Sequence, residues 1–265
     1  MPYSSLHTRY KIGFIEQIKR ARDRILLSYM EHRHNKNISN NFPRLSIANF
    51  DHIGLHINYF GRYEHSQLSM AMEFIENCFP EAMNKAFIDA GANIGNHTVF
   101  FSEKFNNVLA FEPVSETFDL LKLNTKNRKN VQIFNCGLSD SAGRANMVIP
   151  EHNNGGARIE RCALEGDKQA DLVTLDSVVA ERNLEIGLLK IDVEGHEVEV
   201  LEGSKELLFA QRPLVMFEQL EDDINCGNSA YNYLRSAGYS QFFEVRTGVV
   251  HSSRILRLVQ LFTGV

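Results

Sequence analysis

Four acidic residues each follow a short apolar run in this chain: Asp89, Glu112, Asp192 and Glu218. Apolar runs without alternation are typical of buried parallel strands, which are covered on both faces. The carboxyl ends of parallel strands lie at one edge of a sheet, where ligands bind, so we expect these carboxylates to lie close together there. Carboxylates so placed favour a ligand with cationic centres.

The first of these runs continues into a glycine turn. The stretch from Ala86 to Thr98 has the sequence AFIDAGANIGNHT, which predicts a strand, a turn and the start of a helix. Gly91 and Gly95 let the chain turn sharply and let a ligand approach the bare backbone. A strand, a glycine turn and a helix N-terminus together form a nucleotide-type pocket.

The second run indicates which nucleotide derivative would bind. Val108 to Phe111 predicts a strand, and Pro113 keeps Glu112 in extended geometry at its end. An acid roughly 20 residues past the glycines is placed to accept hydrogen bonds from ribose hydroxyls. The glycine spacing departs from G-x-G-x-x-G, and Asp89 would hold a cationic amino group better than a pyrophosphate. The pattern favours S-adenosylmethionine over NAD; a structural turn in another α/β protein remains the alternative.

The ordered motifs resemble the FkbM-type S-adenosylmethionine-dependent methyltransferases over about residues 85 to 220. The resembling segments are Phe87–Thr98, Phe111–Pro113, Asn135–Asp140 (NCGLSD), Leu188–Gly195 (LLKIDVEG) and Val200–Gly203 (VLEG). The resemblance implies a Rossmann-like class I methyltransferase fold and, usually, O-methylation of a hydroxyl on a sugar, glycan or polyketide-type natural product. It does not fix the acceptor.

Resemblance and expected geometry together assign the cofactor residues. S-adenosyl-L-methionine is expected to be held by Asp89, Gly91, Asn93, Gly95, Glu112, Ser139, Asp140 and Asp192. Asp89 would bind the amino group, directly or through water, and Glu112 the ribose diol. The turn from Asn135 to Asp140 corresponds to the adenine-binding corner.

Asp192, Glu194 and His196 are the predicted catalytic residues. Asp192 and Glu194 can project to the same side if the strand stays extended, and an imidazole at His196 can take a proton near neutral pH. A hydrogen-bonded structural histidine at a helix start is equally compatible with the pattern. His97 lies just past the glycine turn, and we expect it to pack its helix rather than to face the cofactor or substrate. Carboxylates here could ligate magnesium, but no spacing requires it, and no metal is predicted.

The alternation of strand and helix from residue 85 predicts an α/β fold with a mostly parallel seven-stranded sheet and an antiparallel closing strand. Further strands are expected at 131–135, 188–192, 213–217, 242–245 and 255–262, and a hairpin or extra strands at 145–149 and 172–175. We divide the chain into an N-terminal helical extension or lid, 1–80, and a methyltransferase domain, 81–265.

The extension begins with an amphipathic helix whose other face is basic. Packing on the core or on a second subunit is favoured over binding to a membrane or an anionic partner, which leaves a homodimer open. Residues 53–64 are expected to form a strand or lid over the pocket mouth. There, His56, Tyr63 and Glu64 are more easily explained as structural than as catalytic.

Composition limits the remaining possibilities. The net charge of −5 argues against a general nucleic-acid binder, and the four cysteines form no C-x-x-C pair. Because no apolar run of membrane-spanning length occurs, we expect a cytoplasmic protein without an integral membrane segment, whose partner is a small-molecule or glycan acceptor. The alternatives are an N-methyltransferase and a non-catalytic cofactor-binding partner subunit.

Overall fold

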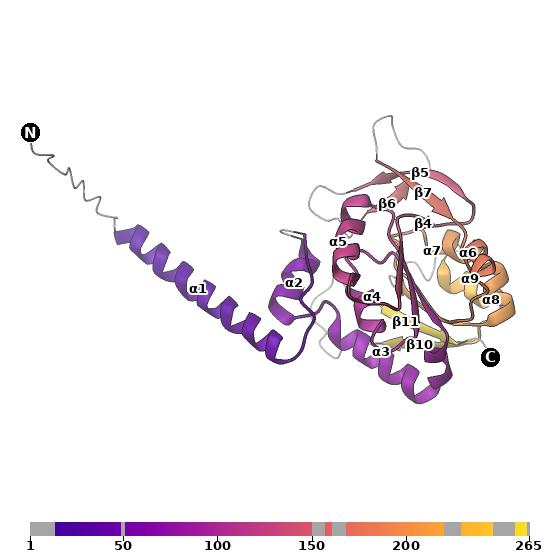
Figure 1. Cartoon of the computed structure of the whole chain (residues 1–265), viewed down its shortest axis with the longest axis horizontal. Helices are drawn as coiled ribbons and strands as arrows, with labels where there is room; N and C mark the ends of the chain where they lie inside the picture. Colours follow the sequence, from indigo (N-terminus) through magenta and orange to yellow (C-terminus); the bar gives the residue numbers. More distant parts are fainter. Residues whose placement is uncertain are drawn as a thin grey trace, which may run out of the picture.

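A central sheet brings the predicted strand ends to one edge of the molecule (Figure 1). The computed structural model describes residues 14–48, 51–149, 157–160, 168–219, 229–245 and 258–263. In these residues the sheet has seven strands in the order β10-β11-β9-β8-β1-β2-β3. Their bounds are β1 Ala86–Ala90, β2 Asn107–Phe111, β3 Val131–Phe134, β8 Ile186–Ile191, β9 Leu214–Gln219, β10 Gln241–Val245 and β11 Leu258–Thr263. Strands β3, β2, β1, β8 and β9 are parallel, and β11 pairs antiparallel with both neighbours, as predicted.

Helices cover both faces of this sheet, which explains why its central strands are apolar throughout. One face carries α3 His65–Cys78, α4 Asn96–Phe101 and α5 Ser115–Thr125 (Figure 1). The other carries α6 Leu175–Arg182, α7 Glu197–Glu202, α8 Lys205–Gln211 and α9 Ala230–Ser236. Every residue of β1 and of β8 is buried. The predicted α/β architecture with a mostly parallel seven-stranded sheet is confirmed among the described residues.

A second, smaller sheet lies beside the carboxyl edge of the first (Figure 1). Among the described residues it contains β4 Gly137–Leu138, β5 Gly143–Val148, β6 Arg158–Glu160 and β7 Lys168–Val173, in the order β4-β7-β5-β6. The predicted hairpin is confirmed by the antiparallel pairing of β5 with β7. Residues 150–156 and 161–167, which connect the strands of this sheet, lie outside the described residues.

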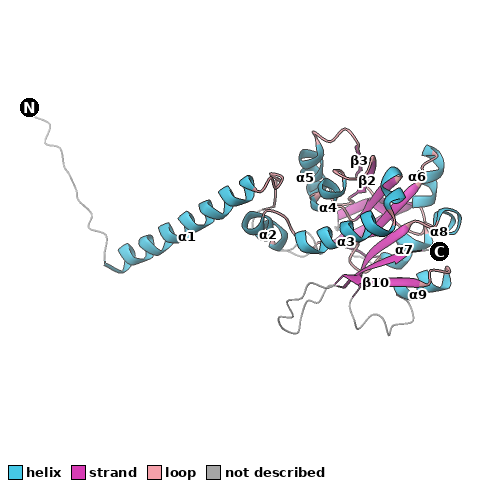
Figure 2. Ribbon diagram, turned by 90° about the horizontal axis from the view of Figure 1, so that it is seen from below, coloured by secondary structure: helices cyan, strands magenta, loops and turns pink. Residues whose placement is uncertain are grey.

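The N-terminal part is helical. Helix α1, Phe14–Ser39, extends away from the sheet and meets the rest of the chain near α2, His52–Phe60 (Figures 1 and 2). The predicted packing of α1 on the core is wrong, because every residue from Ile15 to His32 is exposed. The strand considered at 53–64 is instead α2, since Asp51 caps its N-terminus and left-handed Gly61 ends it.

Helix α3 lies within the predicted extension but packs with the sheet. Its buried residues Leu68, Ala71 and Ile75 share a core cluster with Phe87 of β1. The short 3₁₀ helix η1, Pro80–Asn84, then leads into β1. The boundary at residue 80 remains a prediction. No helix in the described part of the chain combines the length and apolarity needed to cross a membrane.

Candidate cofactor and acceptor site

A cavity of about 250 Å³ lies at the carboxyl edge of the sheet. Its walls come from the turn after β1, the ends of β2 and β8, helix α2 and the small sheet. Of the predicted site residues, Gly91, Asn93, Glu112, Asp192 and Glu194 line it. Residues from distant parts of the sequence therefore meet at the carboxyl edge of the sheet, as expected for the ends of parallel strands.

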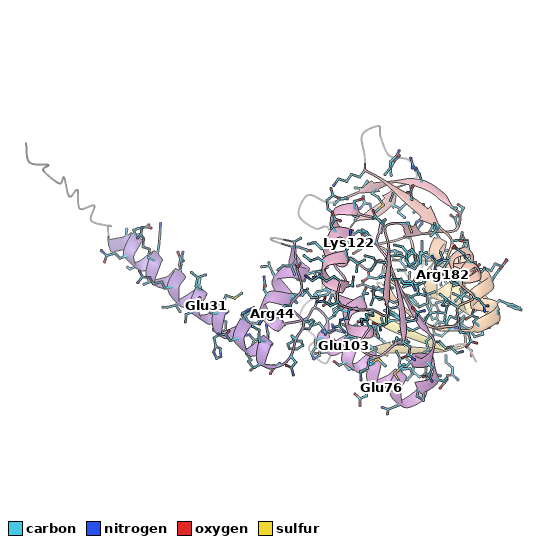
Figure 3. All side chains as sticks on the ribbon, in the orientation of Figure 1. Glu31, Arg44, Glu76, Glu103, Lys122 and Arg182 are labelled. Carbon is cyan, nitrogen blue, oxygen red and sulfur yellow. The ribbon has the colours of Figure 1, made fainter. Side chains whose placement is uncertain are left out.

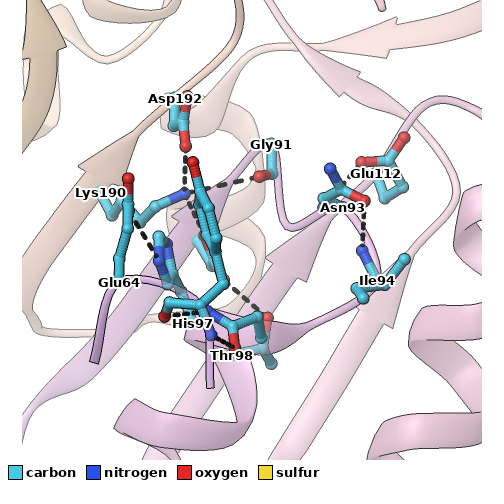
Figure 4. Close-up of polar contacts among 12 residues, drawn as sticks. Glu64, Gly91, Asn93, Ile94, His97, Thr98, Glu112, Lys190 and Asp192 are labelled. Carbon is cyan, nitrogen blue, oxygen red and sulfur yellow. Dashed lines mark hydrogen bonds and ion pairs between the residues drawn. The ribbon is translucent and has the colours of Figure 1, made fainter. Parts of the chain in front are cut away.

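Glu112 lies at the inner wall of this cavity with both carboxylate oxygens engaged. Oε2 accepts a hydrogen bond at 2.9 Å from the backbone N–H of Asn93, which lies beside Glu112 in Figure 4, and Oε1 accepts one from the backbone N–H of Val114 at 2.9 Å. Burial raises the pKa of Glu112 to about 7; the nearby Asp89 charge also raises it, whereas the two hydrogen bonds lower it. This carboxyl group therefore changes charge near neutral pH.

Asp89 is fully buried and does not line the cavity. Its Oδ2 accepts a hydrogen bond of 2.6 Å from Thr98 Oγ1, and its Oδ1 lies 3.0 Å from Lys190 Nζ. A direct contact with the cofactor's amino group, as predicted, would need a route past these two partners. Asp89 instead contacts the cavity wall through Lys190, which does line it.

Lys190 is the residue that the sequence reasoning missed. Its ammonium group lies 3.0 Å from Asp89 Oδ1 and 3.4 Å from Asp192 Oδ2 (Figure 4). Burial alone would lower the pKa of Lys190, but the charges of Asp89 and Asp192 outweigh burial and raise it. A lysine inside the apolar run of β8 was the available signal, because a fully buried lysine is normally paired.

Asp192 and Glu194 both line the cavity, although not by the predicted geometry. Strand β8 ends at Ile191, and Glu194 and Gly195 both have left-handed backbones, with φ of 51° and 91°. The chain therefore turns immediately after Asp192 and does not stay extended. Asp192 is half-buried and Glu194 is exposed, which puts Glu194 at the rim.

The two glycines of the turn have different surroundings. Gly91 lines the cavity with φ of 77°, and a Cβ atom there would lie 1.9 Å from the Asp192 carbonyl oxygen. Gly95 does not line the cavity; with φ of 88°, its missing side chain makes room for Leu121 of α5. Gly91 thus lets the two loops pack closely, and Gly95 lets α4 approach α5.

Ser139, Asp140 and His196 form a separate cluster that does not line the cavity. Ser139 Oγ lies 2.9 Å from His196 Nε2 and donates to Asp140 Oδ1 at 3.1 Å. His196 Nδ1 lies 3.6 Å from Glu199 Oε2. This geometry favours the structural alternative for His196. At the predicted adenine corner, Gly137 and Leu138 line the cavity instead.

A second cavity of about 20 Å³, large enough for one water molecule, adjoins the first. His97, Lys190 and Asp192 line both cavities, and Glu64 and Glu218 line only the second. His97 Nε2 lies 3.3 Å from Glu64 Oε2 (Figure 4), so His97 does more than pack its helix. Among the described residues, no cluster of three or more His, Cys, Asp or Glu residues is arranged to hold a metal ion.

Known proteins match the segment that builds these cavities. Residues 89–241 match the sequence model of the family described as Methyltransferase FkbM domain. The chain is similar to the hexuronic acid methyltransferase AglP of Haloferax volcanii, with 36% identity over 123 residues that cover 45% of this chain and 50% of that protein. Methyltransferase sdnD of Sordaria araneosa is 32% identical over 173 residues, 50% of this chain and 66% of that protein.

A third relative is the 31-O-demethyl-FK506 methyltransferase FkbM of Streptomyces tacrolimicus. It is 32% identical over 152 residues, which cover 44% of this chain and 58% of that protein. The matches therefore span between half and two thirds of these relatives' own lengths.

Proposed function

Because the chain belongs to the FkbM methyltransferase family, we propose that it methylates a hydroxyl group of a sugar, glycan or polyketide-type natural product. S-adenosylmethionine is its cofactor and supplies an activated methyl group. The observation that carries the proposal is the cavity in which Glu112, Lys190 and Asp192 meet at the carboxyl edge of the sheet. The names of two relatives, a hexuronic acid methyltransferase and a 31-O-demethyl-FK506 methyltransferase, support a hydroxyl acceptor of this class.

The lining of the cavity fits the adenosine part of the cofactor. Pro113, Leu138, Met147 and Ile159 provide apolar surface beside Glu112. An apolar slot suits a purine ring, and the carboxylate suits the ribose diol next to it. Each carboxylate oxygen of Glu112 accepts one backbone hydrogen bond and has a further lone pair for a ribose hydroxyl.

The acceptor would meet the three residues that border both cavities. Asp192 Oδ2 lies 3.4 Å from Lys190 Nζ, and the carboxylate can accept a hydrogen bond from the acceptor hydroxyl. Glu64 Oε2 lies 3.3 Å from His97 Nε2 and can orient the imidazole as a general base. We therefore assign three roles. His97 takes the proton of the acceptor hydroxyl, Asp192 orients that hydroxyl, and Glu194 contacts the part of the acceptor that lies at the rim of the cavity. His97 would take the hydroxyl proton as the acceptor oxygen displaced S-adenosylhomocysteine from the methyl carbon.

Methyl transfer from labelled S-adenosylmethionine to hexuronic acid glycosides and to hydroxylated polyketides tests the proposal. We expect His97→Gln to reduce kcat by about 100-fold or more while leaving cofactor affinity unchanged. His196→Gln is the matched control and should retain most of the turnover, because His196 does not line the cavity. Unchanged turnover in His97→Gln, or loss only in His196→Gln, would reverse the assignment.

A further inference from the structure

Helix α1 carries apolar side chains that are exposed in the described part of the chain. Ile15 and Ile25 are each 71% exposed. Of the thirteen exposed large apolar residues in the described chain, seven lie on this helix: Ile15, Ile18, Ile25, Leu26, Leu27, Tyr29 and Met30. Contiguous exposed apolar surface of this kind marks an interaction site.

Four of the exposed apolar residues form a stripe on a helix that also carries a net positive charge. Ile15, Ile18, Ile25 and Tyr29 recur at spacings of three, seven and four residues, which places them on one face of the helix. Helix α1 contains six Lys and Arg residues against three Asp and Glu residues, a net charge of +3, whereas the whole chain has a net charge of −5. The helix that carries the apolar stripe is therefore basic, in a chain that is acidic as a whole.

The C-terminal end of this stripe meets α2 at Tyr29, and its N-terminal part lies beyond that contact. The hydrogen bonds from α1 to α2 come from its C-terminal half: Tyr29 pairs with the Tyr59 hydroxyl, and Arg33 and Asn37 donate to the Tyr59 carbonyl. Figures 1 and 2 show the N-terminal half extending away from the sheet in both views. In Figure 3 the side chains of α1, including the labelled Glu31, project from a helix that stands apart from the packed side chains of the sheet and its helices.

From the exposed stripe and the net positive charge of the helix, we infer that α1 binds the surface of an anionic lipid membrane. The helix lies in the plane of the interface, with its apolar stripe among the upper acyl chains and its Lys and Arg side chains at the phosphates. The acidic remainder of the chain is held away from the surface because α1 projects from it.

The position of Arg22 favours a membrane over a second copy of the chain. Arg22 is four residues after Ile18 and three before Ile25, so it falls within the apolar stripe. Arg22 Nη2 lies 2.7 Å from Asp23 Oδ1, and in a pair of helices packed through this stripe this ion pair would be desolvated among isoleucines, at a cost that can exceed its attraction. At a membrane, its long side chain reaches the phosphate layer while its stem stays in apolar surroundings.

Co-sedimentation of the full chain with vesicles tests this inference. We expect binding to phosphatidylcholine vesicles that contain one third phosphatidylglycerol, weak binding to pure phosphatidylcholine, and loss of binding at high salt. Ile18→Asp/Ile25→Asp should abolish binding, because it puts charges in the apolar stripe. Lys19→Gln/Arg22→Gln should weaken it roughly tenfold or more.

Two variants elsewhere provide matched controls. Lys122→Gln/Lys126→Gln removes two exposed cations at the C-terminal end of α5, and Phe209→Asp changes an apolar residue that is 77% exposed on α8. Both should bind vesicles like the unmodified chain. Titration with S-adenosylhomocysteine checks that each variant is folded. This titration also separates the membrane inference from the proposed function, on which it does not rest.

Absence of binding to anionic vesicles, or equal binding by Ile18→Asp/Ile25→Asp, would overturn the inference. Light scattering measures the oligomeric state and so tests whether a second copy of the chain covers the stripe instead. A dimer that this double variant dissociates, without any vesicle binding by the unmodified chain, would identify a second copy as the partner and would also overturn it.

Discussion

Lys190 organises the charges of the site. It is the cation that joins Asp89 beneath the cavity to Asp192 on its wall. Two carboxylates and an ammonium group leave water together here, and their mutual attraction must offset the free-energy cost of desolvation. Removing one of these charges should therefore lower the free energy of unfolding more than replacing both members of an ion pair.

We expect Lys190→Met to lower the free energy of unfolding by about 3 kcal/mol or more, because it leaves the fully buried Asp89 without its cation. Urea unfolding measures the loss. The control Lys85→Met removes a partly exposed ion pair with Glu185 and should cost less than about 1 kcal/mol. Asp89→Asn/Lys190→Met should recover part of the loss. Equal losses of unfolding free energy in the two lysine variants would show that the buried Asp89–Lys190 pair stabilises the fold no more than the exposed Lys85–Glu185 pair.

Glu112 makes cofactor binding depend on pH. Its pKa of about 7 exceeds the ordinary value of 4.5, so the stability contribution of this group falls as the pH rises from 4.5 to about 7. Ribose hydroxyls donate hydrogen bonds to the ionised carboxylate of Glu112. The fraction of Glu112 that is ionised increases as the pH rises through about 7. Calorimetric titration should therefore show about tenfold tighter binding of S-adenosylhomocysteine at pH 8 than at pH 6. Glu112→Gln should remove this difference, and a difference that persists in the variant would assign it to another group.

At the scale of elements, two turns with left-handed glycines hold the site loops together. The turn after β1 contains Gly91, and the turn after β8 contains Gly195. A Cβ at Gly91 would collide with the Asp192 carbonyl oxygen, whereas a Cβ at Gly195 would meet nothing within 4 Å. The same substitution therefore has different consequences in the two turns.

Gly195→Ala should cost about 1 to 2 kcal/mol of unfolding free energy from backbone strain alone. Gly91→Ala adds a backbone collision to similar strain, so we expect a larger loss together with weaker S-adenosylhomocysteine binding. Thermal unfolding and ligand titration of both variants measure the contrast. Equal effects of the two substitutions would mean that the close approach of the two loops is unimportant.

Elements with a clear local sequence pattern were predicted well, and elements without one were not. Buried parallel strands are continuous apolar runs, and β1, β2, β3, β8 and β9 were all predicted within two residues of their observed ends. Helix α2 was missed because its Asp51 cap and Gly61 terminator flank a short segment whose apolar residues also suit a strand. The separate cluster of Ser139 and His196 depends on how α7 packs, which no local pattern encodes.

At the scale of the whole molecule, the cavity is assembled from three parts. Helix α2 supplies His52 and Ile53, the main sheet supplies Glu112 and Lys190, and the small sheet supplies apolar residues including Met147. A ligand that fills this cavity ties the three parts together and binds only the folded chain. The homodimer and the cytoplasmic location remain predictions.

Ligand binding should therefore stabilise the whole fold. At about 100 times its Kd, S-adenosylhomocysteine should raise the free energy of unfolding by about 2.7 kcal/mol. Chemical unfolding with and without ligand measures this increase. An unchanged midpoint at such concentrations would mean that the ligand does not bind the folded chain in preference to the unfolded chain.

Isothermal titration of the purified chain with S-adenosylhomocysteine tests the central claim most directly, with NAD as the control ligand. We expect binding of S-adenosylhomocysteine in the micromolar range, none of NAD, and loss of binding in Glu112→Ala, because that carboxylate lines the cavity. Absence of S-adenosylhomocysteine binding, or equal binding by Glu112→Ala, would contradict the assignment of this cavity to the methyl donor.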